Sequence, residues 1–336
     1  MSRISSRQLG LGVLAAVLAL AAVLTQMDLR LASSQGVTLT ARATDATVPL
    51  DDPLASVWQT AEPLEIPLSE QNVALPLGGG SIRTVTARAL HDGDRIFFRL
   101  EWEDTTEDTS AFTPEEFRDA VAIQFPAKGV STTPSFCMGQ PGGEVNLWHW
   151  KADWQSDIDS GFVNVQQAFP NSVVDFYPFA DDEEFNPGLA VGNPLSQVNR
   201  TTPVENLVAR GFGTLTSGDS QLVDGKGVWQ DNKWYVLFAR DLEATGDTYT
   251  PFSAGQSTDV AFAVWDGSAG ERNGLKSVSL FASLVIEEGP DGDGTVIGDV
   301  EDDDDDTTII LMIVFVLVVI AAAGIALAVR RQIRRA

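Results

Sequence analysis

The sequence predicts an all-β domain, a sandwich or a barrel, followed by a membrane-spanning C-terminal segment. Short stretches that alternate apolar and polar residues recur between turn-forming residues throughout the body of the chain, which is typical of β-strands. Only residues 113–120 offer a helix start, with Pro114 at the first helical position. Every residue from Ile309 to Val329 is apolar or glycine, enough for a helix to cross the ~30 Å hydrocarbon core of a bilayer.

The strands follow one another along the region 51–288. The first two, at 83–90 and 95–102, flank His91–Asp94 and predict a hairpin. Further strands are expected at 120–125, 145–150, 227–230, 234–240, 259–264 and 278–286. Residues 175–210 lack periodicity and are rich in Pro, Asn, Asp and Gly, so we expect a long loop with a short helix around 204–209.

The two ends of the chain predict its placement at the cell membrane. Arg3 and Arg7 precede an apolar run, so residues 1–34 are expected to be a signal peptide or an uncleaved N-terminal anchor. Residues 289–306 are rich in Gly and Asp and predict an extended acidic stalk before the transmembrane helix 309–329. The basic tail 330–336 is expected to stay cytoplasmic, so a single-pass protein would hold its main domain outside.

The composition excludes several classes of partner and cofactor. Asp and Glu number 47 against 22 Lys and Arg, a net charge of −25, which repels nucleic acid and resembles the surface of a halophile's protein. Cys137 is the only cysteine, so the chain has no internal disulfide, no covalent haem motif and too few thiols for an iron–sulfur cluster.

Side chains that can ligate a metal are few. His91 and His149 are the only histidines, and Met138 is the only methionine of the region 51–288. A zinc site of the usual His/Cys kind would need more ligands than these. The chain also lacks a Gly-x-Ser-x-Gly elbow, a His-Glu-x-x-His motif and a phosphate-binding loop, so a free-standing enzyme is not predicted.

Two clusters could carry chemistry. In residues 136–143, Met138 lies on a Gly- and Pro-rich loop before an aromatic strand, where its thioether could ligate iron or merely fill a gap in the core. In residues 263–277, a glycine-rich loop delivers Lys276 before the last strand. A lysine binds iron only as the neutral amine, which requires burial; the alternative is an ordinary exposed loop lysine.

A set of short segments, in this order, carries a resemblance to a known family. They are Asp52-Pro53 with Trp58, 89–93, 98–102, 119–126, Met138-Gly139, Trp148-His149-Trp150-Lys151, 209–214, 225–229, 261–267 and 271–276. Through them the chain resembles the haem b-binding gamma subunits of ethylbenzene dehydrogenase-type molybdenum enzymes, in the type II branch of the dimethyl sulfoxide reductase family.

The resemblance implies a fold and a cofactor site. The fold would be an immunoglobulin-like or DOMON-like antiparallel β-sandwich, with one non-covalent haem b between its sheets. The family's methionine and lysine axial ligands fall on Met138 and Lys276. His149 and Lys151 are weaker alternatives, which would share one face of the strand around 145–150.

The function expected from these features is electron transfer rather than catalysis. A membrane-anchored, extracytoplasmic haem b subunit would relay electrons to or from the iron–sulfur subunit of a complex that also holds a molybdopterin subunit. The complex would be a respiratory reductase, such as a nitrate reductase, or a dehydrogenase. The alternatives are a cell-surface carbohydrate- or solute-binding β-sandwich without haem, and a purely structural surface protein.

Overall fold

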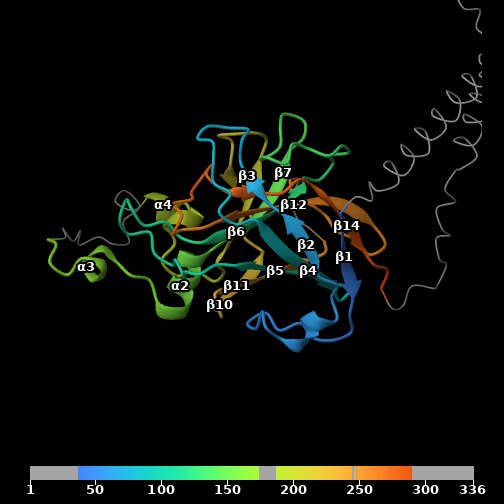
Figure 1. The fold of residues 1–336 in the computed structure, drawn as a ribbon, viewed down its shortest axis with the longest axis horizontal. Coiled ribbons are helices and arrows are strands. Elements are labelled where there is room, and N and C mark those ends of the chain that lie inside the picture. Colours follow the sequence, from blue (N-terminus) through green and yellow to red (C-terminus); the bar gives the residue numbers. More distant parts are fainter. Residues whose placement is uncertain (1–36, 174–186, 244–245, 247, 290–336) are drawn as a thin grey trace, which may run out of the picture. The chain divides into compact units, whose positions relative to one another are not determined.

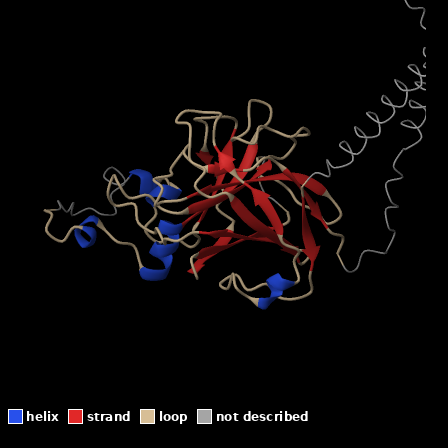
Figure 2. Ribbon diagram, viewed as in Figure 1, coloured by secondary structure: helices blue, strands red, loops and turns tan. Residues whose placement is uncertain are grey.

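β-Strands are the main regular elements of the described part of the chain, with long loops and a few short helices between them (Figures 1 and 2). The computed structural model describes residues 37–173, 187–243, 246 and 248–289. They belong to the first of two compact units, residues 1–290 and 291–336. The all-β prediction is therefore confirmed.

The first sheet brings together strands from both ends of the described chain. Its order is β10 (Asp224–Gln230), β11 (Lys233–Asp241), β5 (Arg95–Glu103), β4 (Thr84–His91), β1 (Thr38–Ala43), β14 (Ala282–Ile286) and the first half of β12 (Ser257–Trp265). Strand β2 (Leu64–Pro67) also pairs with β4. The predicted hairpin is β4–β5, whose register places Ala89 opposite Phe98.

The second sheet continues from the same long strand. Residues 257–260 of β12 pair with β14, whereas residues 261–265 pair with β6 (Ala120–Pro126). The order then runs through β7 (Val145–Lys151), β8 (Val204–Ala209) and β9 (Thr216–Ser217). Strand β13 (Ser277–Val278) pairs with the second half of β12, and β3 (Ser69–Glu70) pairs with β13. Because β12 belongs to both sheets, it links the core to the loops that follow its end.

An aromatic core fills the space between the two sheets. Phe98 of the first sheet lies 5.6 Å from Phe125 and 5.8 Å from Trp148 of the second, measured between ring centroids. Trp150 lies 5.0 Å from Trp234 in the same way. These side chains are almost fully buried, and each contributes a large apolar area to stability. The core therefore holds the two sheets face to face.

Short helices lie beside the sheets in the connections (Figure 2). They are η1 (Ser56–Gln59), α2 (Ala152–Ser160), α3 (Val165–Ala168), α4 (Pro187–Ala190) and η2 (Pro194–Ser196). Helix α2 follows β7 without a break and buries Trp154. Helix α3 begins with a capping box, in which the side chains of Asn164 and Gln167 each bond the other's backbone N–H.

Three local predictions are wrong. Residues 113–116 form a turn rather than a helix start, because the Glu116 carboxylate accepts hydrogen bonds from Ser110 and the backbone N–H groups of residues 112 and 113. Residues 204–209 form strand β8 rather than a helix. The segment is buried on both faces, and its backbone groups form hydrogen bonds with the neighbouring strand β7. The single strand predicted at 278–286 is divided into β13 and β14, which pair with different parts of β12.

The segments that were predicted to lie at or in the membrane are outside the residues that the structure describes. Residues 1–34, 309–329 and 330–336, and almost all of 289–306, are not among the described residues. Within the described ranges, none of the helices has the length and apolar character needed to cross a bilayer. Strand β1 precedes residue 51, where the domain was predicted to begin.

Candidate functional site

The predicted ligands gather on the face of the second sheet that points away from the aromatic core. Register places His149 of β7 opposite Ala122 of β6 and Glu205 of β8, and places Ala122 opposite Ala263 of β12. Residues two positions along each strand share this face. We call it the loop-covered face, formed by Ala120, Ala122, Gln124, Val145, Leu147, His149, Lys151, Glu205, Leu207, Ala209, Ala261, Ala263 and Trp265.

The centre of the loop-covered face is lined by short side chains. Ala120, Ala122, Ala261 and Ala263 are neighbours across β6 and β12. Trp265 packs against three of them, while the apolar side chains of β7 and β8 lie further along the face. These alanines form an apolar floor, over which the Trp265 ring packs.

Met138 approaches this face from the loop between β6 and β7. Its half-buried side chain packs against Val145, Leu147, Leu207 and Ala209. Its backbone has φ +64°, a left-handed conformation that is rare and costly for a bulky residue. Such an outlier persists only where its surroundings hold it.

Gln124 holds the Met138 loop against the sheet. Its side-chain oxygen accepts the Met138 backbone N–H at 3.0 Å. Its amide nitrogen donates to the carbonyl oxygens of Ser135 and Phe136, both at 3.2 Å. Because Gln124 is 6% exposed, these bonds are shielded from water and fix the position of the loop.

Lys276 reaches the same face from the loop before β13. The residue is 7% exposed, and its Nζ lies 5.0 Å from the centroid of the Trp265 ring. Among the described residues, no carboxylate pairs with this ammonium and no hydrogen bond to it is formed. Burial lowers the pKa of Lys276, so deprotonation to the neutral amine costs less here than for an exposed lysine.

The backbone of Lys276 is held by the loop that follows β3. Its N–H donates to the carbonyl oxygen of Gly78, and its own carbonyl accepts the N–H of Gln71. Gly79 has φ +91°, and a Cβ there would lie 2.2 Å from the Lys276 nitrogen. Only glycine permits this close approach, so the sequence of the β3 loop helps to set where Lys276 points.

The Met138 and Lys276 loops lie near each other. Burial raises the pKa of the Cys137 thiol, and the charge of Lys276 partly opposes that rise. Cys137, which directly precedes Met138, is 1% exposed. Two segments about 140 residues apart in sequence therefore reach the same face of the sheet.

His149 lies on the loop-covered face as a neutral imidazole. Its ring lies 4.8 Å from that of Trp265, with 32° between their planes. Its pKa is well below the usual value because of burial, with Lys151, Arg118 and Lys276 adding to the effect. Its Nε2 is buried and has no hydrogen-bond partner among the described residues. An orphaned nitrogen of this kind is chemically able to ligate iron.

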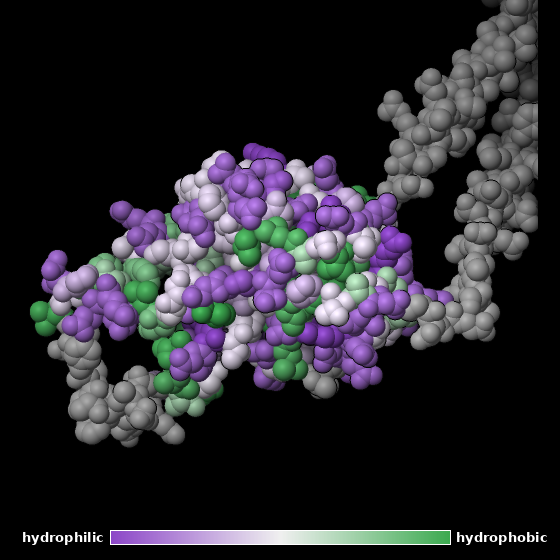
Figure 3. Space-filling model, turned by 90° about the horizontal axis from the view of Figure 1, so that it is seen from below, coloured by the Kyte–Doolittle hydropathy of each residue, from purple (hydrophilic) through white to green (hydrophobic). Residues whose placement is uncertain are grey.

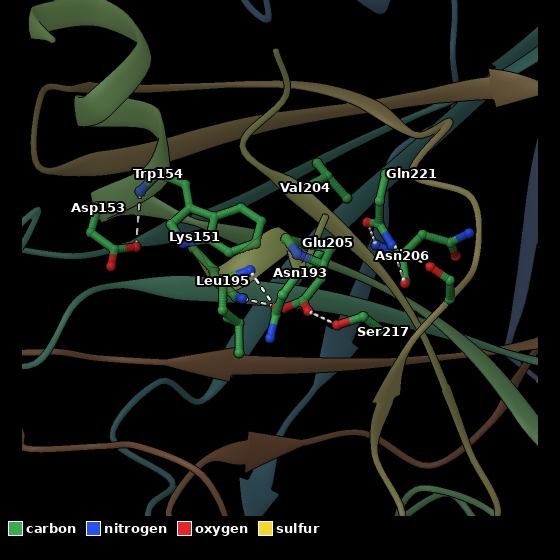
Figure 4. Close-up of polar contacts among 12 residues, drawn as sticks. Lys151, Asp153, Trp154, Asn193, Leu195, Val204, Glu205, Asn206, Ser217 and Gln221 are labelled. Carbon is green, nitrogen blue, oxygen red and sulfur yellow. Dashed lines mark hydrogen bonds and ion pairs between the residues drawn. The ribbon is translucent and has the colours of Figure 1, made fainter. Parts of the chain in front are cut away.

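Lys151 has a different environment from Lys276 on the same face. Its ammonium forms an ion pair with Glu205, whose carboxylate also accepts a hydrogen bond from Ser217 (Figure 4). It also lies 3.8 Å from the centroid of the Trp154 ring. A lysine held as a paired cation has no free lone pair, so this arrangement disfavours Lys151 as a ligand.

The structure thus brings all four candidate residues to one face, but not between the sheets as expected. The aromatic side chains described above occupy the space between the sheets. His91, the other histidine, is buried at the end of β4 in the first sheet and lies outside the loop-covered face. Sequence reasoning missed the role of Gln124, although a lone polar residue in an otherwise apolar strand was a usable signal.

Comparison with known proteins assigns the chain to a family. The family model described as ethylbenzene dehydrogenase matches residues 55–277, which include every candidate ligand. The chain belongs to the ethylbenzene dehydrogenase family. The resemblance identified from the sequence is thereby confirmed.

Three relatives of this ethylbenzene dehydrogenase family chain carry informative descriptions. A Haloferax mediterranei protein described as a respiratory nitrate reductase heme subunit is 29% identical over 71% of this chain and 70% of its own length. The chlorate reductase subunit gamma of Ideonella dechloratans is 27% identical, over 68% and 76%. The dimethylsulfide dehydrogenase subunit gamma of Rhodovulum sulfidophilum is 29% identical, over 59% of each chain.

Solved structures show a more distant likeness. A carbohydrate-binding module of family 9 from Caldicellulosiruptor kristjanssonii, in complex with glucose, covers 76% of this chain and 97% of its own. Its TM-score is 0.39 and its sequence identity is 10%.

Proposed function

We propose that this chain is the haem b electron-transfer subunit of a molybdenum oxidoreductase, with Met138 and Lys276 as the axial ligands. Membership of the ethylbenzene dehydrogenase family and the heme and gamma subunits among the relatives support this function. The partners would be an iron–sulfur subunit and a molybdopterin subunit. The described fold would be an immunoglobulin-like or DOMON-like sandwich. It is antiparallel except at β1, which pairs in parallel with β4 and β14 and so departs from the fully antiparallel sandwich that was expected.

One observation carries the ligand assignment: Lys276 is buried without an anion, whereas Lys151 on the same face is paired with Glu205. An unpaired buried ammonium is unfavourable, so a fold that keeps one is expected to use it as the neutral amine. Iron in a bound haem would give the lone pair of that amine a partner.

The residues around the ligands would bind and tune the cofactor. Haem supplies the one-electron chemistry when bound. Gln124 holds the Met138 loop, and Gly79 allows the β3 loop to pack against the Lys276 backbone. The alanine floor and the buried Trp265 exclude water from this face, and an apolar environment with fixed ligands helps to set the reduction potential.

The same proposal includes a place in the cell. The chain would be a single-pass protein of the cell membrane, anchored by residues 309–329, with the β domain outside and the C-terminus in the cytoplasm. The acidic stalk 289–306 would link domain and membrane. In this position the subunit can exchange electrons with a membrane carrier.

The test is the optical spectrum of the full-length chain, produced with haem in high salt. Met138→Leu and Lys276→Leu remove the ligand atom but keep apolar volume. Lys276→Leu also removes a buried charge, so we expect it to fold at least as well as the wild type. The wild type should show six-coordinate, low-spin haem b, and both variants should shift toward the high-spin spectrum.

Two controls address the alternative ligands. His149→Leu, and the double variant Lys151→Met with Glu205→Gln, should leave the low-spin spectrum in place. The double change avoids leaving Glu205 buried and unpaired, which would itself destabilise the fold. A low-spin spectrum that survives Lys276→Leu but is lost in His149→Leu would overturn the lysine assignment. A folded wild type that takes up no haem would overturn the function in favour of a carbohydrate- or solute-binding module.

A further inference from the structure

Three buried aspartates converge at one end of the second sheet. Asp119 directly precedes β6, Asp266 directly follows β12, and the Ala120–Trp265 register places these two strand ends together. Asp104 directly follows β5 of the first sheet. One carboxylate oxygen from each lies within 4.8 Å of the other two. Their residues are 4% (Asp104), 0% (Asp119) and 9% (Asp266) exposed, so the group is shielded from water.

The structure provides no positive side chain to balance these carboxylates. Among the described residues, no lysine, arginine or histidine forms an ion pair with Asp104, Asp119 or Asp266. Burial raises the pKa of Asp104 to about 6 and that of Asp119 to about 7, and a neighbouring carboxylate adds to each. Buried carboxylates this close together must bind either protons or a cation.

In the described part of the chain, hydrogen bonds reach both oxygens of Asp119 but only one oxygen each of Asp266 and Asp104. The two oxygens of Asp119 accept from the N–H groups of Gly267 and Asp108 and from the Trp234 indole. Asp266 accepts from Ser268 and Ala269. In Asp104, Oδ1 accepts from Thr106, whereas Oδ2 is fully buried and accepts no hydrogen bond from any described residue, although the Trp102 side chain acts to lower the pKa of Asp104.

A second orphaned oxygen lies in the same region. Asp108, whose N–H bonds Asp119, has a buried Oδ2 that likewise has no partner. Asp108 is also close to Gly267, because a Cβ at Gly267 would lie 2.7 Å from the Cβ of Asp108. Two buried carboxylate oxygens that accept no hydrogen bond from the described residues therefore lie in or beside the aspartate group. Each lacks the partner that a metal ion would provide.

From this arrangement we propose that Asp104, Asp119 and Asp266 bind one Ca²⁺ ion. Calcium takes only oxygen ligands, at about 2.3–2.6 Å, so two of its ligand oxygens can lie up to about 5 Å apart. Magnesium at about 2.1 Å limits that separation to about 4.2 Å. The three carboxylate oxygens lie within 4.8 Å of one another, a spacing that calcium can span with all three as ligands.

The ion would join three parts of the fold. It would connect the end of β5 with the start of β6 and with the start of the loop 266–276, and that loop leads to Lys276. Glu271 already braces that loop, because its carboxylate accepts the Asp266 N–H at 3.1 Å and the Ser81 N–H at 2.9 Å. Binding at Asp266 would restrain the base of the lysine loop without contacting Lys276.

The experiment titrates CaCl₂ into the full-length chain after dialysis against EGTA and then into chelator-free buffer. Calorimetry gives stoichiometry and affinity, and thermal melting is followed with Ca²⁺, with Mg²⁺ and with EGTA. The variants are Asp104→Asn, Asp119→Asn and Asp266→Asn. The matched control is Asp94→Asn, which changes an exposed aspartate in the β4–β5 turn.

We expect one Ca²⁺ per wild-type chain and a rise of about 5 °C or more in the melting midpoint at saturating Ca²⁺. Each cluster variant should bind Ca²⁺ at least tenfold more weakly, while Asp94→Asn should match the wild type. In EGTA, Asp104→Asn and Asp266→Asn should melt no lower than the wild type, because each removes a buried negative charge. Asp119→Asn also loses an acceptor for the N–H groups of Gly267, Asp108 or Trp234, so its calcium binding is judged by calorimetry on folded protein. A lost calcium response could then not be ascribed to misfolding.

Three results would overturn the proposal. One is a wild type that binds no stoichiometric Ca²⁺ and melts identically with Ca²⁺ and EGTA, which would leave protons as the neutralising species. Another is Ca²⁺ binding that survives all three Asn variants, which would place the ion elsewhere. The last is a midpoint that responds to Mg²⁺ but not to Ca²⁺. None of these readouts depends on haem, so the proposed function is tested separately.

Discussion

Lys151 and Lys276 show how one residue type takes opposite states on a single face. Both are almost fully buried, at 2% and 7% exposed. Lys151 has Glu205 of β8 as its counter-ion. Burial lowers the pKa of Lys151, and the negative charge of Glu205 partly opposes that change. Lys276 has no carboxylate partner among the described residues and instead lies beside the Trp265 ring. The partner, rather than the residue type or the depth of burial, decides which lysine is free to bind another group.

At the same scale, Gln124 is expected to position Met138. Gln124→Leu would leave the Met138 N–H and two carbonyl oxygens without their bonds, at a cost of about 1–3 kcal/mol for each buried group. We expect a partly high-spin spectrum in the haem-loaded protein and a shifted reduction potential. Spectra and redox titration of the full-length chain measure both.

The matched control for Gln124 is Gln155, an equally buried glutamine away from the Met138 loop. Its side chain accepts the N–H of Gly227 and the Trp150 indole N–H. Gln155→Leu should lower stability by a similar amount but leave the spectrum unchanged. If both variants change the spectrum equally, Gln124 has only a structural role.

Asp119 should give the calcium-free protein a distinctive pH dependence. Its pKa rises from 3.8 to about 7 on folding, so between about pH 4 and 7 the folded state binds more protons than the unfolded state. Stability from this group is therefore present below that window and lost as pH rises through it. His149 acts in the opposite sense near pH 6.5, because its pKa is lowered.

The contribution of Asp119 is isolated by comparison with Asp119→Asn in EGTA. Denaturant unfolding of both chains at several pH values should show the wild type losing stability relative to the variant between pH 4 and 7. The loss should be a few kcal/mol, since each pKa unit corresponds to about 1.4 kcal/mol. A constant difference across this range would show that Asp119 does not titrate there.

At the scale of elements, β10 and β7 depend on a glycine for their contact. A Cβ on Gly227 would lie 2.1 Å from Cζ2 of Trp150, whose ring is confined by Trp102 and Trp234. Gly227→Ala should therefore destabilise the fold by about 1–3 kcal/mol through overpacking. Chemical denaturation measures the change, and Gly289→Ala, where a Cβ meets nothing within 4 Å, should fall within about 0.5 kcal/mol. Equal effects of the two would show that the Trp150 ring can move aside.

The whole molecule is dominated by negative charge. The net charge is −25, and Figure 3 shows hydrophilic residues over much of the visible described surface, interrupted by smaller hydrophobic patches. Repulsion among these charges opposes the compact state, and salt weakens it because the screening length falls from about 10 Å at 0.1 M to about 3 Å at 1 M.

Salt should therefore raise the melting midpoint of the full-length chain, most steeply below about 1 M KCl. Screening saturates near that concentration, whereas exclusion of salt from the protein surface continues to act above it. Calorimetric scans from 0.1 to 3 M KCl would separate the two regimes. A midpoint that rises linearly throughout would argue that self-repulsion contributes little.

Local patterns in the sequence were enough to predict the β class, the β4–β5 hairpin and most strands, because alternation with period two is a property of neighbouring residues. They failed at 204–209, where burial on both faces removes that alternation. The scarcity of ligating side chains similarly drew attention to Met138 and Lys276, whose role as ligands stays a prediction.

What the sequence could not supply is how distant residues meet. The ion pair of Lys151 with Glu205, the approach of the Met138 and Lys276 loops, and the grouping of Asp104, Asp119 and Asp266 all join separate strands. Each depends on strand order and register, which arise from packing of the whole domain. The environment of a buried charge is a long-range property, and for that reason it became visible only once the two sheets were assembled.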